Sequence, residues 1–452
     1  MRIHSVFFVA VAVLVIAGCS LPAVREKAGA VGVVSHPAMD AGLYEGPAVV
    51  VHKGTPVFSW YDPKRRLMAD FGGGPKWVSE GAPAPSLLSH NFLHSDGHSV
   101  YFVFRPKGEA VGWKYTIVRA SHDDGKTLSE PVIINHGNGA MEPAISSSGK
   151  GDVYVAWNDE RDGPLDIYMN ISHDFGKTWL EQELRMNTEN EPGTVGATGQ
   201  QIFVDGERVW IVWIDVAKED KPRRLMIRSS NDSGRSWTGP GVLAENENFY
   251  DPKIMMVKGR MVIIWCSISP ANKFVHMAKG IVSDDLGKTW EPMGEIKVRS
   301  WMQFEINASS DKSGNIYLAL AVRDKYKTGL DNVYFTMSAD GGKAWSEPAR
   351  LQTNTPHHTA ANLPQIASDD SGRVFVAWVD YRNIRGNVYA NYSGDRGRTW
   401  LKEDMLLSRS DHNASLPRVA SSGSGRFPVV WLESNDDGMA EGVVRMKEVE
   451  AR

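Results

Sequence analysis

A short motif with the pattern S-x-D-x-G-x-[ST]-W recurs along the chain and constrains its fold more than any other feature. Four copies match fully, one has Leu128 in place of the tryptophan, and one has Ala344 in place of the hydroxyl residue. Successive copies begin 51, 58, 53, 55 and 55 residues apart, over 121–128, 172–179, 230–237, 283–290, 338–345 and 393–400. Self-similarity at such a regular period is the signature of a repeat architecture.

The residues of the motif are those that build a tight turn. An aspartate side chain accepts hydrogen bonds from nearby backbone N–H groups, and glycine adopts a positive φ at no steric cost. The hydroxyl residue adds a further local bond, and the tryptophan offers a large apolar face to a neighbouring element. We therefore interpret each motif aspartate as structural and expect none of them to be catalytic.

A second pattern lies between the motifs. A glycine turn is followed by an alternating run of β-branched and aromatic residues that ends in tryptophan, as in 149–157 and 372–378. Such runs predict β-strands. Each unit then reads as strand, turn, strand, loop, strand, motif turn and strand, which predicts the four-stranded antiparallel blade of an all-β propeller.

The number of blades depends on how the two ends are assigned. Six complete units end near Arg409, and a partial seventh contains 416–420, 427–431 and 442–449 but lacks the motif and a fourth strand. The early segment 46–60 could supply that strand and close the ring. We therefore predict seven blades within a propeller over 44–452, with six blades as the alternative.

The motifs resemble the Asp-box repeats of the sialidase (neuraminidase) superfamily, also called bacterial neuraminidase repeats or BNR, over roughly residues 85–449. The resemblance implies a propeller that binds ligands on the face opposite the Asp-boxes. That face is formed by the loop after each second strand and the connection into each first strand. The motif is specific for fold but not for activity, because proteins without hydrolytic activity carry the same box.

The first residues form a targeting segment. The apolar run 6–16 would rise about 16 Å as a helix, too little for a hydrocarbon core of about 30 Å, so residues 1–19 fit a signal peptide. The run ends in Ile-Ala-Gly-Cys, which resembles the lipobox of bacterial lipoproteins. This resemblance implies a lipid on Cys19 and, with Ser20 after it, the outer membrane. Residues 20–43 would then be a tether, and an ordinary signal peptide is the alternative.

Composition argues against one class of partner. The chain has 50 Lys and Arg against 54 Asp and Glu, so its net charge of −4 leaves no basic excess for a nucleic-acid backbone. Only two cysteines are present, and with Cys19 lipidated Cys266 has no disulfide partner. We expect no nucleic-acid partner, no cofactor and no metal site.

The expected ligand face repeats the pattern W-x-D-x-R. Asp159 with Arg161 and Asp380 with Arg382 belong to this pattern, and Glu142 precedes a first strand. Two interpretations remain open. The carboxylates could bind sugar hydroxyls while the arginines clamp an acid group. Alternatively, the pairs are blade-to-blade salt bridges that recur because the blades recur.

Sialidases surround the substrate carboxylate with three arginines and use a Tyr–Glu pair and an acidic residue for the chemistry. The resemblance would assign the clamps to Arg161, Arg323 and Arg382, the nucleophile pair to Tyr250 and Glu305, and the acid to Asp159. The F/Y-R-I-P motif of that family is missing, because Phe-Arg-Pro at 104–106 lacks the intervening residue and follows a second strand. This departure argues against a sialidase proper.

Two functions follow from these observations. We predict an envelope-anchored, sialidase-like propeller lipoprotein that binds a glycan or an envelope protein on the face opposite the Asp-boxes and meets the membrane through Cys19. The alternative is an exo-acting glycoside hydrolase that cleaves terminal sugars. Binding needs only a concave surface with polar and aromatic contacts, whereas hydrolysis needs two groups that converge on one pocket.

Overall fold

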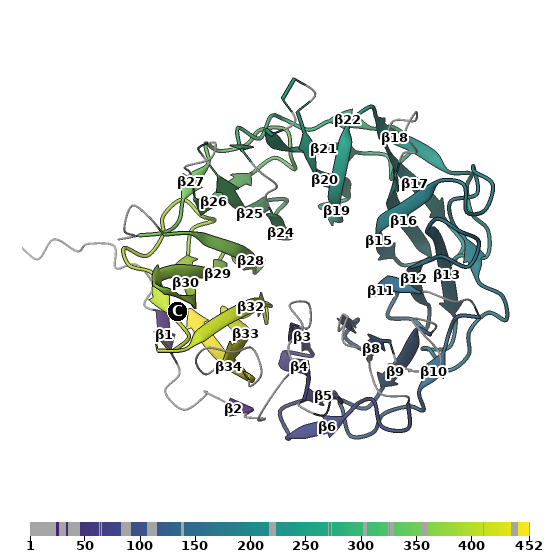
Figure 1. Ribbon diagram of the computed structural model, residues 1–452, viewed down its shortest axis with the longest axis horizontal. Coiled ribbons are helices and arrows are strands. Elements are labelled where there is room, and N and C mark those ends of the chain that lie inside the picture. The colour runs from purple at the N-terminus through teal and green to yellow at the C-terminus, as the bar shows by residue number, and fades with distance from the viewer. Residues whose placement is uncertain are drawn as a thin grey trace, which may run out of the picture.

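The computed structural model is a ring of antiparallel β-sheets arranged around a central axis (Figure 1). It describes residues 24–26, 33–34, 46–62, 64, 66–82, 92–105, 115–136, 140–216, 223–269, 271–272, 274–301, 305–323, 325, 330–353, 359–409, 411–434 and 442–451. Within these residues there are eight sheets, each of which is one blade. The all-β propeller is therefore confirmed, but the predicted count of seven blades and the alternative of six are both wrong.

The strands of each blade follow one another from the centre of the ring outward (Figure 1). Blades 1 and 2 contain β3 (Ala48–His52), β4 (Thr55–Tyr61), β5 (Leu67–Asp70) and β6 (Pro75–Trp77), then β7 (Phe92–Ser95), β8 (Val100–Phe104), β9 (Ile117–Ser121) and β10 (Val132–Ile133). Blades 3 and 4 contain β11 (Met141–Ser147), β12 (Val153–Asp159), β13 (Asp166–Ser172) and β14 (Leu184–Arg185), then β15 (Gly196–Asp205), β16 (Arg208–Val216), β17 (Arg224–Ser230) and β18 (Gly241–Glu245).

The second half of the chain completes the ring in the same way. Blades 5 and 6 contain β19 (Asn248–Val257), β20 (Arg260–Ile268), β21 (His276–Ser283), β22 (Glu291–Pro292) and β23 (Arg299–Ser300), then β24 (Glu305–Ser310), β25 (Ile316–Arg323), β26 (Asp331–Ser338) and β27 (Ala349–Arg350). Blades 7 and 8 contain β28 (Ala361–Ser368), β29 (Val374–Asn383), β30 (Arg385–Ser393) and β31 (Met405–Leu406), then β32 (Asn413–Val419), β33 (Arg426–Ser434) and β34 (Gly442–Ala451).

The second strand of each blade lies deepest in the core. Every residue of β8 and β12 is buried, on both faces of the sheet. Both faces are covered because neighbouring blades pack against them, and this explains why these strands are continuous runs of β-branched and aromatic residues. The outermost strands are short, often only two residues, which limits the unpaired sheet edge exposed to solvent.

The tryptophan of the repeated motif packs onto the preceding blade. Trp237 of blade 4 joins a cluster with Tyr154 and Ile171 of blade 3. The ring of Trp400 in blade 7 meets Phe335 of blade 6 edge-on, with ring centroids 4.8 Å apart. Each motif therefore supplies part of the interface between two blades as well as a turn within one.

The motif itself forms the turn between the third and fourth strands. In blade 4, Asp232 accepts hydrogen bonds from Ser230 Oγ (2.7 Å), Ser236 N (2.8 Å) and Ser236 Oγ (2.5 Å). Gly234 has φ of 80°, as the motif requires. The bond from Ser236 Oγ is the main reason that the pKa of Asp232 falls to about 2. The carboxylate is thus held by its own turn, as predicted for a structural residue.

The ring closes through residues near the N-terminus. β1 (Val24–Glu26) and β2 (Val33–Val34) both pair antiparallel with β34, which completes blade 8. The expectation that 46–60 supplies this strand is wrong, because those residues form β3 and β4 of blade 1. The predicted tether 20–43 contains β1 and β2, and Cys19 lies outside the described residues.

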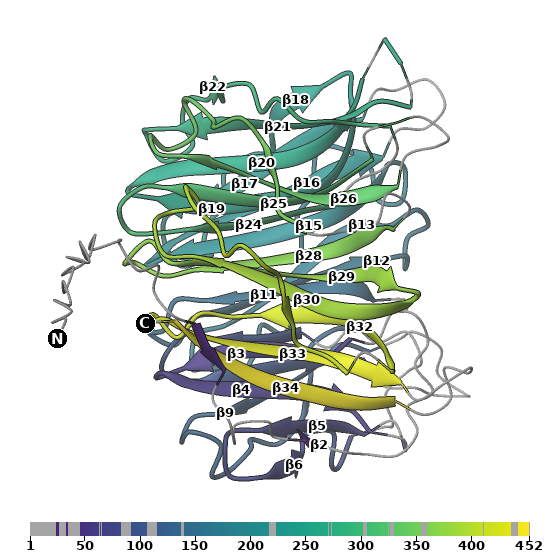
Figure 2. The ribbon, with the colours of Figure 1, turned by 90° about the vertical axis from the view of Figure 1, so that its left-hand side faces the viewer.

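The connections divide between two faces of the disc, which Figure 2 shows edge-on. Because the strands are antiparallel, the hairpin from first to second strand and the motif turn share one face, which we call the repeat-turn face. The loop from second to third strand and the connection to the next blade share the other, which we call the opposite face. Among the described residues, no helix is long and apolar enough to cross a bilayer.

Candidate functional site

The first strands of the blades form the inner wall of the ring, and several of them begin with the same irregularity. In blades 3, 5, 7 and 8 the register with the second strand shifts near the opposite face. One residue at each shift has a positive φ: Glu142 (46°), Asp251 (53°), Leu363 (53°) and Leu416 (52°). Each is followed by proline. In blade 4, Gly199 at φ 68° lies within the corresponding shift.

This backbone conformation is unfavourable for the residues that adopt it. Residues other than glycine rarely take a left-handed φ, and residues before proline are biased toward extended conformations. The following prolines, Pro143 and Pro252 among them, are buried, so packing against the wall enforces the bulge. Strain of about 1–3 kcal/mol persists only where the surrounding structure imposes it, often at functional sites. In this protein the bulge leaves the side chains of Glu142 and Asp251 exposed to solvent.

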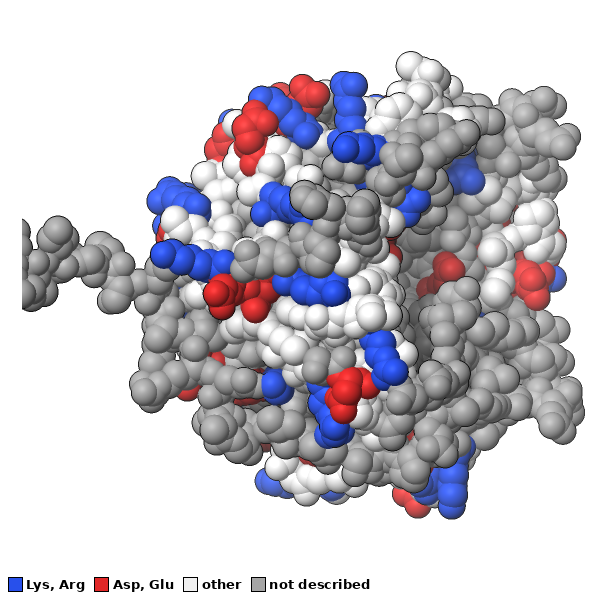
Figure 3. All heavy atoms as spheres, turned by 60° about the vertical axis from the view of Figure 1, so that its left-hand side comes forward, with Lys and Arg blue, Asp and Glu red and all other residues white. Residues whose placement is uncertain are grey.

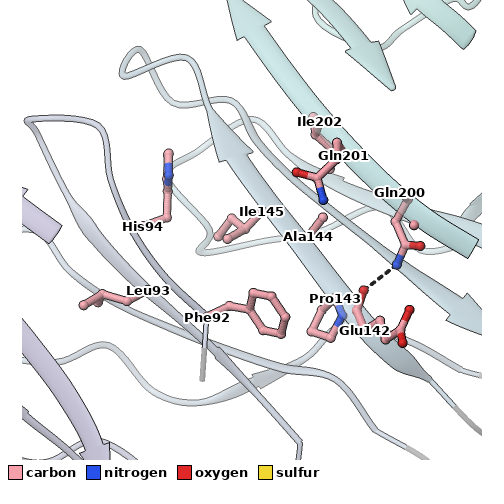
Figure 4. A pocket seen from close by; sticks show the side chains of 11 residues that line it. Phe92, Leu93, His94, Glu142, Pro143, Ala144, Ile145, Gln200, Gln201 and Ile202 are labelled. Carbon is pink, nitrogen blue, oxygen red and sulfur yellow. Dashed lines mark hydrogen bonds between the residues drawn. The ribbon is translucent and has the colours of Figure 1, made fainter. Parts of the chain in front are cut away.

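A cavity of about 280 Å³ opens on the inner wall between blades 2, 3 and 4. Figure 4 shows Phe92 beside Pro143, with Glu142 and Gln200 at one edge and His94 on the other side. Gln200 Nε2 donates to the backbone oxygen of Glu142. The cavity thus combines an apolar floor with amide, imidazole and carboxylate groups, and its volume lies at the lower end for small-molecule sites.

A buried cation lies close to Glu142, which lines this cavity. Arg105 is 4% exposed, and its Nη1 donates to the backbone oxygen of Ala140 at 2.9 Å. Burial lowers the pKa of Arg105, and the nearby Tyr61 and Glu142 oppose that shift. Arg105, which follows the second strand of blade 2, is therefore close enough to interact with the charge of Glu142. Its side chain is buried and not exposed to a ligand.

A second cavity of about 190 Å³ continues the wall across blades 4, 5 and 6. Gln201 lines both cavities, so the two are neighbours on one surface. Lys253, Met255 and Ser309 are among the other lining residues. Figure 3 shows the molecule hollowed at the centre of the ring. The outer surface beside this hollow carries both cationic and anionic residues.

Two carboxylates from adjacent blades influence each other on this wall. Glu305 begins β24 in blade 6, and Asp251 occupies the bulge of blade 5. Solvent reaches both side chains. The pKa of Glu305 is nevertheless raised, mainly because the surrounding blades displace part of the water around its carboxyl group. A backbone hydrogen bond from Leu363 opposes the shift, and the charge of Asp251 adds to it. Lys253 Nζ lies 2.5 Å from Asp251 Oδ1 and forms an ion pair with it.

Tyr250 is engaged inside its own blade. Its hydroxyl lies 2.6 Å from Nδ1 of His276, and its ring packs against the core between blades 5 and 6. Burial lowers the pKa of His276, which favours the neutral imidazole at this position. Burial also raises the pKa of the Cys266 thiol, in line with the apolar run around it. Tyr250 is thus half-buried next to the bulge that carries Asp251.

The W-x-D-x-R pattern of blade 3 forms a closed ion pair. The carboxylate of Asp159 is fully buried and accepts hydrogen bonds from Trp157 Nε1 (3.0 Å) and Arg161 Nη2 (2.6 Å). Arg161 also pairs with Glu183 and lies over the ring of Tyr168, 4.0 Å from its centroid. All of these residues belong to one blade, so the expectation of blade-to-blade salt bridges is wrong in that respect.

The other predicted arginines are paired in the same way. Arg382 lies 2.7 Å from both Asp380 and Asp404 within blade 7, and Arg323 lies 2.9 Å from Asp331 within blade 6. Pairs at the corresponding ends of second strands occur in three more blades, formed by Asp62 with Arg66, Asp215 with Arg224, and Glu433 with Arg445. In several blades, an acidic residue two positions after a tryptophan is thus buried and forms an ion pair with an arginine.

The structure divides the predicted site residues into two groups. Glu142 and Glu305 lie on the inner wall with Asp251 and Lys253, which were not among the predicted site residues. Of the remaining predicted residues, Tyr250 contacts His276 and the core between blades 5 and 6. The others lie in ion pairs within single blades, namely Asp159, Arg161, Arg323, Asp380 and Arg382. The repeated acidic residue before a proline, at 142–143 and 251–252, is the signal that could have identified the wall.

Comparisons with known proteins agree with this architecture. The family model of the BNR repeat-like domain matches residues 200–429. The polysaccharide lyase Uly1 has a similar fold, with a TM-score of 0.55, 11% identity and coverage of 90% of this chain and 99% of that one. An ulvan lyase of family PL25 gives a TM-score of 0.54 at 11% identity, covering 85% and 98%.

Other comparisons add less. The Hadza microbial sialidase Hz136 is 17% identical, with a TM-score of 0.42 and coverage of 75% of this chain and 73% of that one. No curated protein sequence matches the chain significantly. Because the family model covers half of the chain and the fold agrees with it, this chain belongs to the BNR repeat-like family.

Proposed function

We propose that the inner wall near the opposite face binds a neutral oligosaccharide. The observation that carries this proposal is the repeated bulge, which holds Glu142 and Asp251 exposed at corresponding positions of two blades. Sugars present many hydroxyl donors, and a hydrogen bond to a charged acceptor contributes about 1.5–3 kcal/mol. Phe92 and Pro143 provide apolar contact for the face of a sugar ring, as expected for a small-molecule site.

The pairing of the arginines favours a neutral sugar over an acidic one. A sugar carboxylate is best recognised by a free guanidinium that binds both oxygens. Arg161, Arg323 and Arg382 each already bind an aspartate of their own blade. Oligosaccharides are also the class to test first because Uly1, which shares this fold, is a polysaccharide lyase. A protein ligand is the alternative occupant of the same wall.

Calorimetric titration with matched neutral and uronic-acid oligosaccharides tests this proposal. We expect binding of a neutral member, weakened at least tenfold by Glu142→Gln. Glu160→Gln is the matched control, because Glu160 is exposed on the same face of blade 3 but lies in the loop after the second strand. Binding of acidic sugars alone, or equal affinities for the two variants, would contradict the proposal.

Glycoside hydrolysis is a second candidate, favoured by one observation. The pKa of Glu305 is raised by enclosure and by the charge of Asp251, and glycosidases use two neighbouring carboxyl groups, one of which has a raised pKa. Glu305 would protonate the leaving oxygen, and Asp251 would act as base or nucleophile. Turnover of neutral aryl glycosides that is abolished by Glu305→Gln, with binding retained, would support it. Binding without turnover would exclude it for the sugars tested.

We also propose that a lipid on Cys19 attaches the protein to the outer membrane. The support is the sequence Ile-Ala-Gly-Cys at 16–19 with Ser20 after it, and several acyl chains would give stable attachment. The mass of the N-terminal peptide from membrane-purified protein tests this directly. A diacylglycerol on Cys19, and release of the Cys19→Ser variant into the soluble fraction, are the expected results. An unmodified Cys19 in the mature protein would contradict the proposal.

A further inference from the structure

We propose that the repeat-turn face lies against the membrane and that the opposite face, with its inner-wall cavities, points away from it. The inference rests on the proposed lipid at Cys19 and adds an orientation to it. Three observations carry it: where β1 begins, how few residues separate β1 from Cys19, and how tall the propeller is.

The start of β1 lies at the repeat-turn face. β1 pairs antiparallel with β34, so that Val24 is opposite Ala451 and Glu26 is opposite Val449. The neighbouring pair Arg426 and Glu450 marks the same end of blade 8. Arg426 Nη2 donates to the backbone oxygen of Gly54, in the hairpin of blade 1, which belongs to the repeat-turn face. Figures 1 and 2 both show β1 beside the C-terminal end of β34.

The chain between Cys19 and Val24 is short. Five Cα-to-Cα steps span at most about 17 Å even when fully extended. β34 alone is ten residues long, which corresponds to a rise of about 33 Å between the two faces. A lipid on Cys19 therefore holds the repeat-turn face near the headgroups. It cannot extend along the outer edge of blade 8 to bring the opposite face to the bilayer.

The repeat-turn face carries charged side chains of both signs. Motif aspartates such as Asp232 are bound within their own turns, and exposed cations such as Lys177 alternate with them. The orientation is thus set by the tether. A consequence is that the inner wall opens toward the aqueous phase, where long glycans or proteins have free access, and not toward lipid headgroups.

Two labels at opposite ends of one blade test the orientation. Lys177→Cys lies in the motif turn of blade 3, and Glu160→Cys lies in its opposite loop; both native side chains are exposed. The native Cys266 is fully buried and will not react. The lipidated chain, purified from membranes, is labelled with a fluorophore and reconstituted into vesicles of phosphatidylethanolamine and phosphatidylglycerol that carry a nitroxide on the headgroup.

We expect quenching at position 177 to be at least threefold stronger than at position 160. Insertion of 20 glycine and serine residues between Ser20 and Val24 should remove most of this difference, because the tether then reaches either face. Equal or reversed quenching in lipidated protein overturns the orientation and leaves the anchor intact. A mature N-terminus without lipid overturns both, so the two failures are distinguished by the mass of the N-terminal peptide.

Discussion

The guanidinium of Arg161 lies 2.6 Å from the carboxylate of Asp159, in a fully buried position of the same blade. This geometry means that the W-x-D-x-R pattern of the chain forms an ion pair within one blade, so the guanidinium of Arg161 is already bound to a carboxylate. The same arrangement recurs in Arg382 and Asp380. The inner wall keeps exposed carboxylates, those of Glu142 and Asp251.

Loss of Arg161 should destabilise the protein more than loss of the pair. Arg161→Met leaves Asp159 buried without its partner, and breaking a buried pair costs about 3–5 kcal/mol. The double variant Asp159→Asn with Arg161→Met should lose less, because the buried charge of Asp159 is removed together with its partner, although Glu183 still loses its arginine. Equilibrium denaturation by urea measures both. If the single variant is as stable as the wild type, the ion pair does not stabilise the protein.

Removal of the charge at Glu305 should stabilise the protein at neutral pH. Its pKa in the folded state is raised, so the folded state binds the proton more tightly than the unfolded state, and stability falls as pH rises through the folded pKa. Glu305→Gln avoids this loss. Its melting temperature should therefore exceed that of the wild type at pH 7.5, with the difference vanishing near pH 4. A difference that does not depend on pH would contradict the assignment.

The motif aspartates should contribute stability that disappears in acid. The pKa of Asp232 is lowered to about 2 by hydrogen bonds within its turn, so its contribution is present above the unfolded value near 4 and is lost as pH falls toward 2. Asp232→Ala should lower the melting temperature at pH 7 and have a smaller effect at pH 2.5. Glu207→Ala, an exposed change on the same face, serves as the control and should have little effect at either pH.

Glycines of the motif should be far less replaceable than glycines of the hairpins. A Cβ on Gly397 would lie 2.2 Å from the ring of Phe335, whereas one on Gly206 meets nothing within 4 Å. Both residues have positive φ, at 78° and 64°, so alanine pays a backbone cost of about 1–2 kcal/mol at either position. Urea denaturation should show an additional loss of unfolding free energy for Gly397→Ala that Gly206→Ala does not show. Equal losses of unfolding free energy in the two variants would mean that the interface between blades 6 and 7 rearranges to accommodate the added methyl group.

Removal of β1 and β2 should open the ring. A chain that begins at residue 36 leaves the outer edge of β34 without these partners, and an unpaired edge promotes association. We expect a lower melting temperature and concentration-dependent oligomers in light scattering, compared with a chain that begins at residue 20. Unchanged stability and a monomeric state would show that the closure contributes little.

The elements that could be predicted from the sequence are those that depend on local chemistry. The turn around Asp232 and Gly234 needs only hydrogen bonds and a positive φ within seven residues, so the pattern predicted it wherever it occurred. The alternating apolar runs predicted the second strands for the same reason. Blade 1 was missed because Gly72, Gly73 and Gly74 replace the motif there. The sequence Trp60-Tyr61-Asp62, which repeats the W-x-D pattern, was the available sign of it.

The number of blades, the closure of the ring and the site depend on contacts between residues far apart in the chain. Pairing of β1 with β34 joins residues more than 400 positions apart, and no local preference specifies such a contact. The partner of each arginine depends on which carboxylate the blade buries beside it. The raised pKa of Glu305 depends on Asp251 of another blade and on enclosure by the ring. These properties arise from long-range packing and electrostatics, which act only after the blades have assembled.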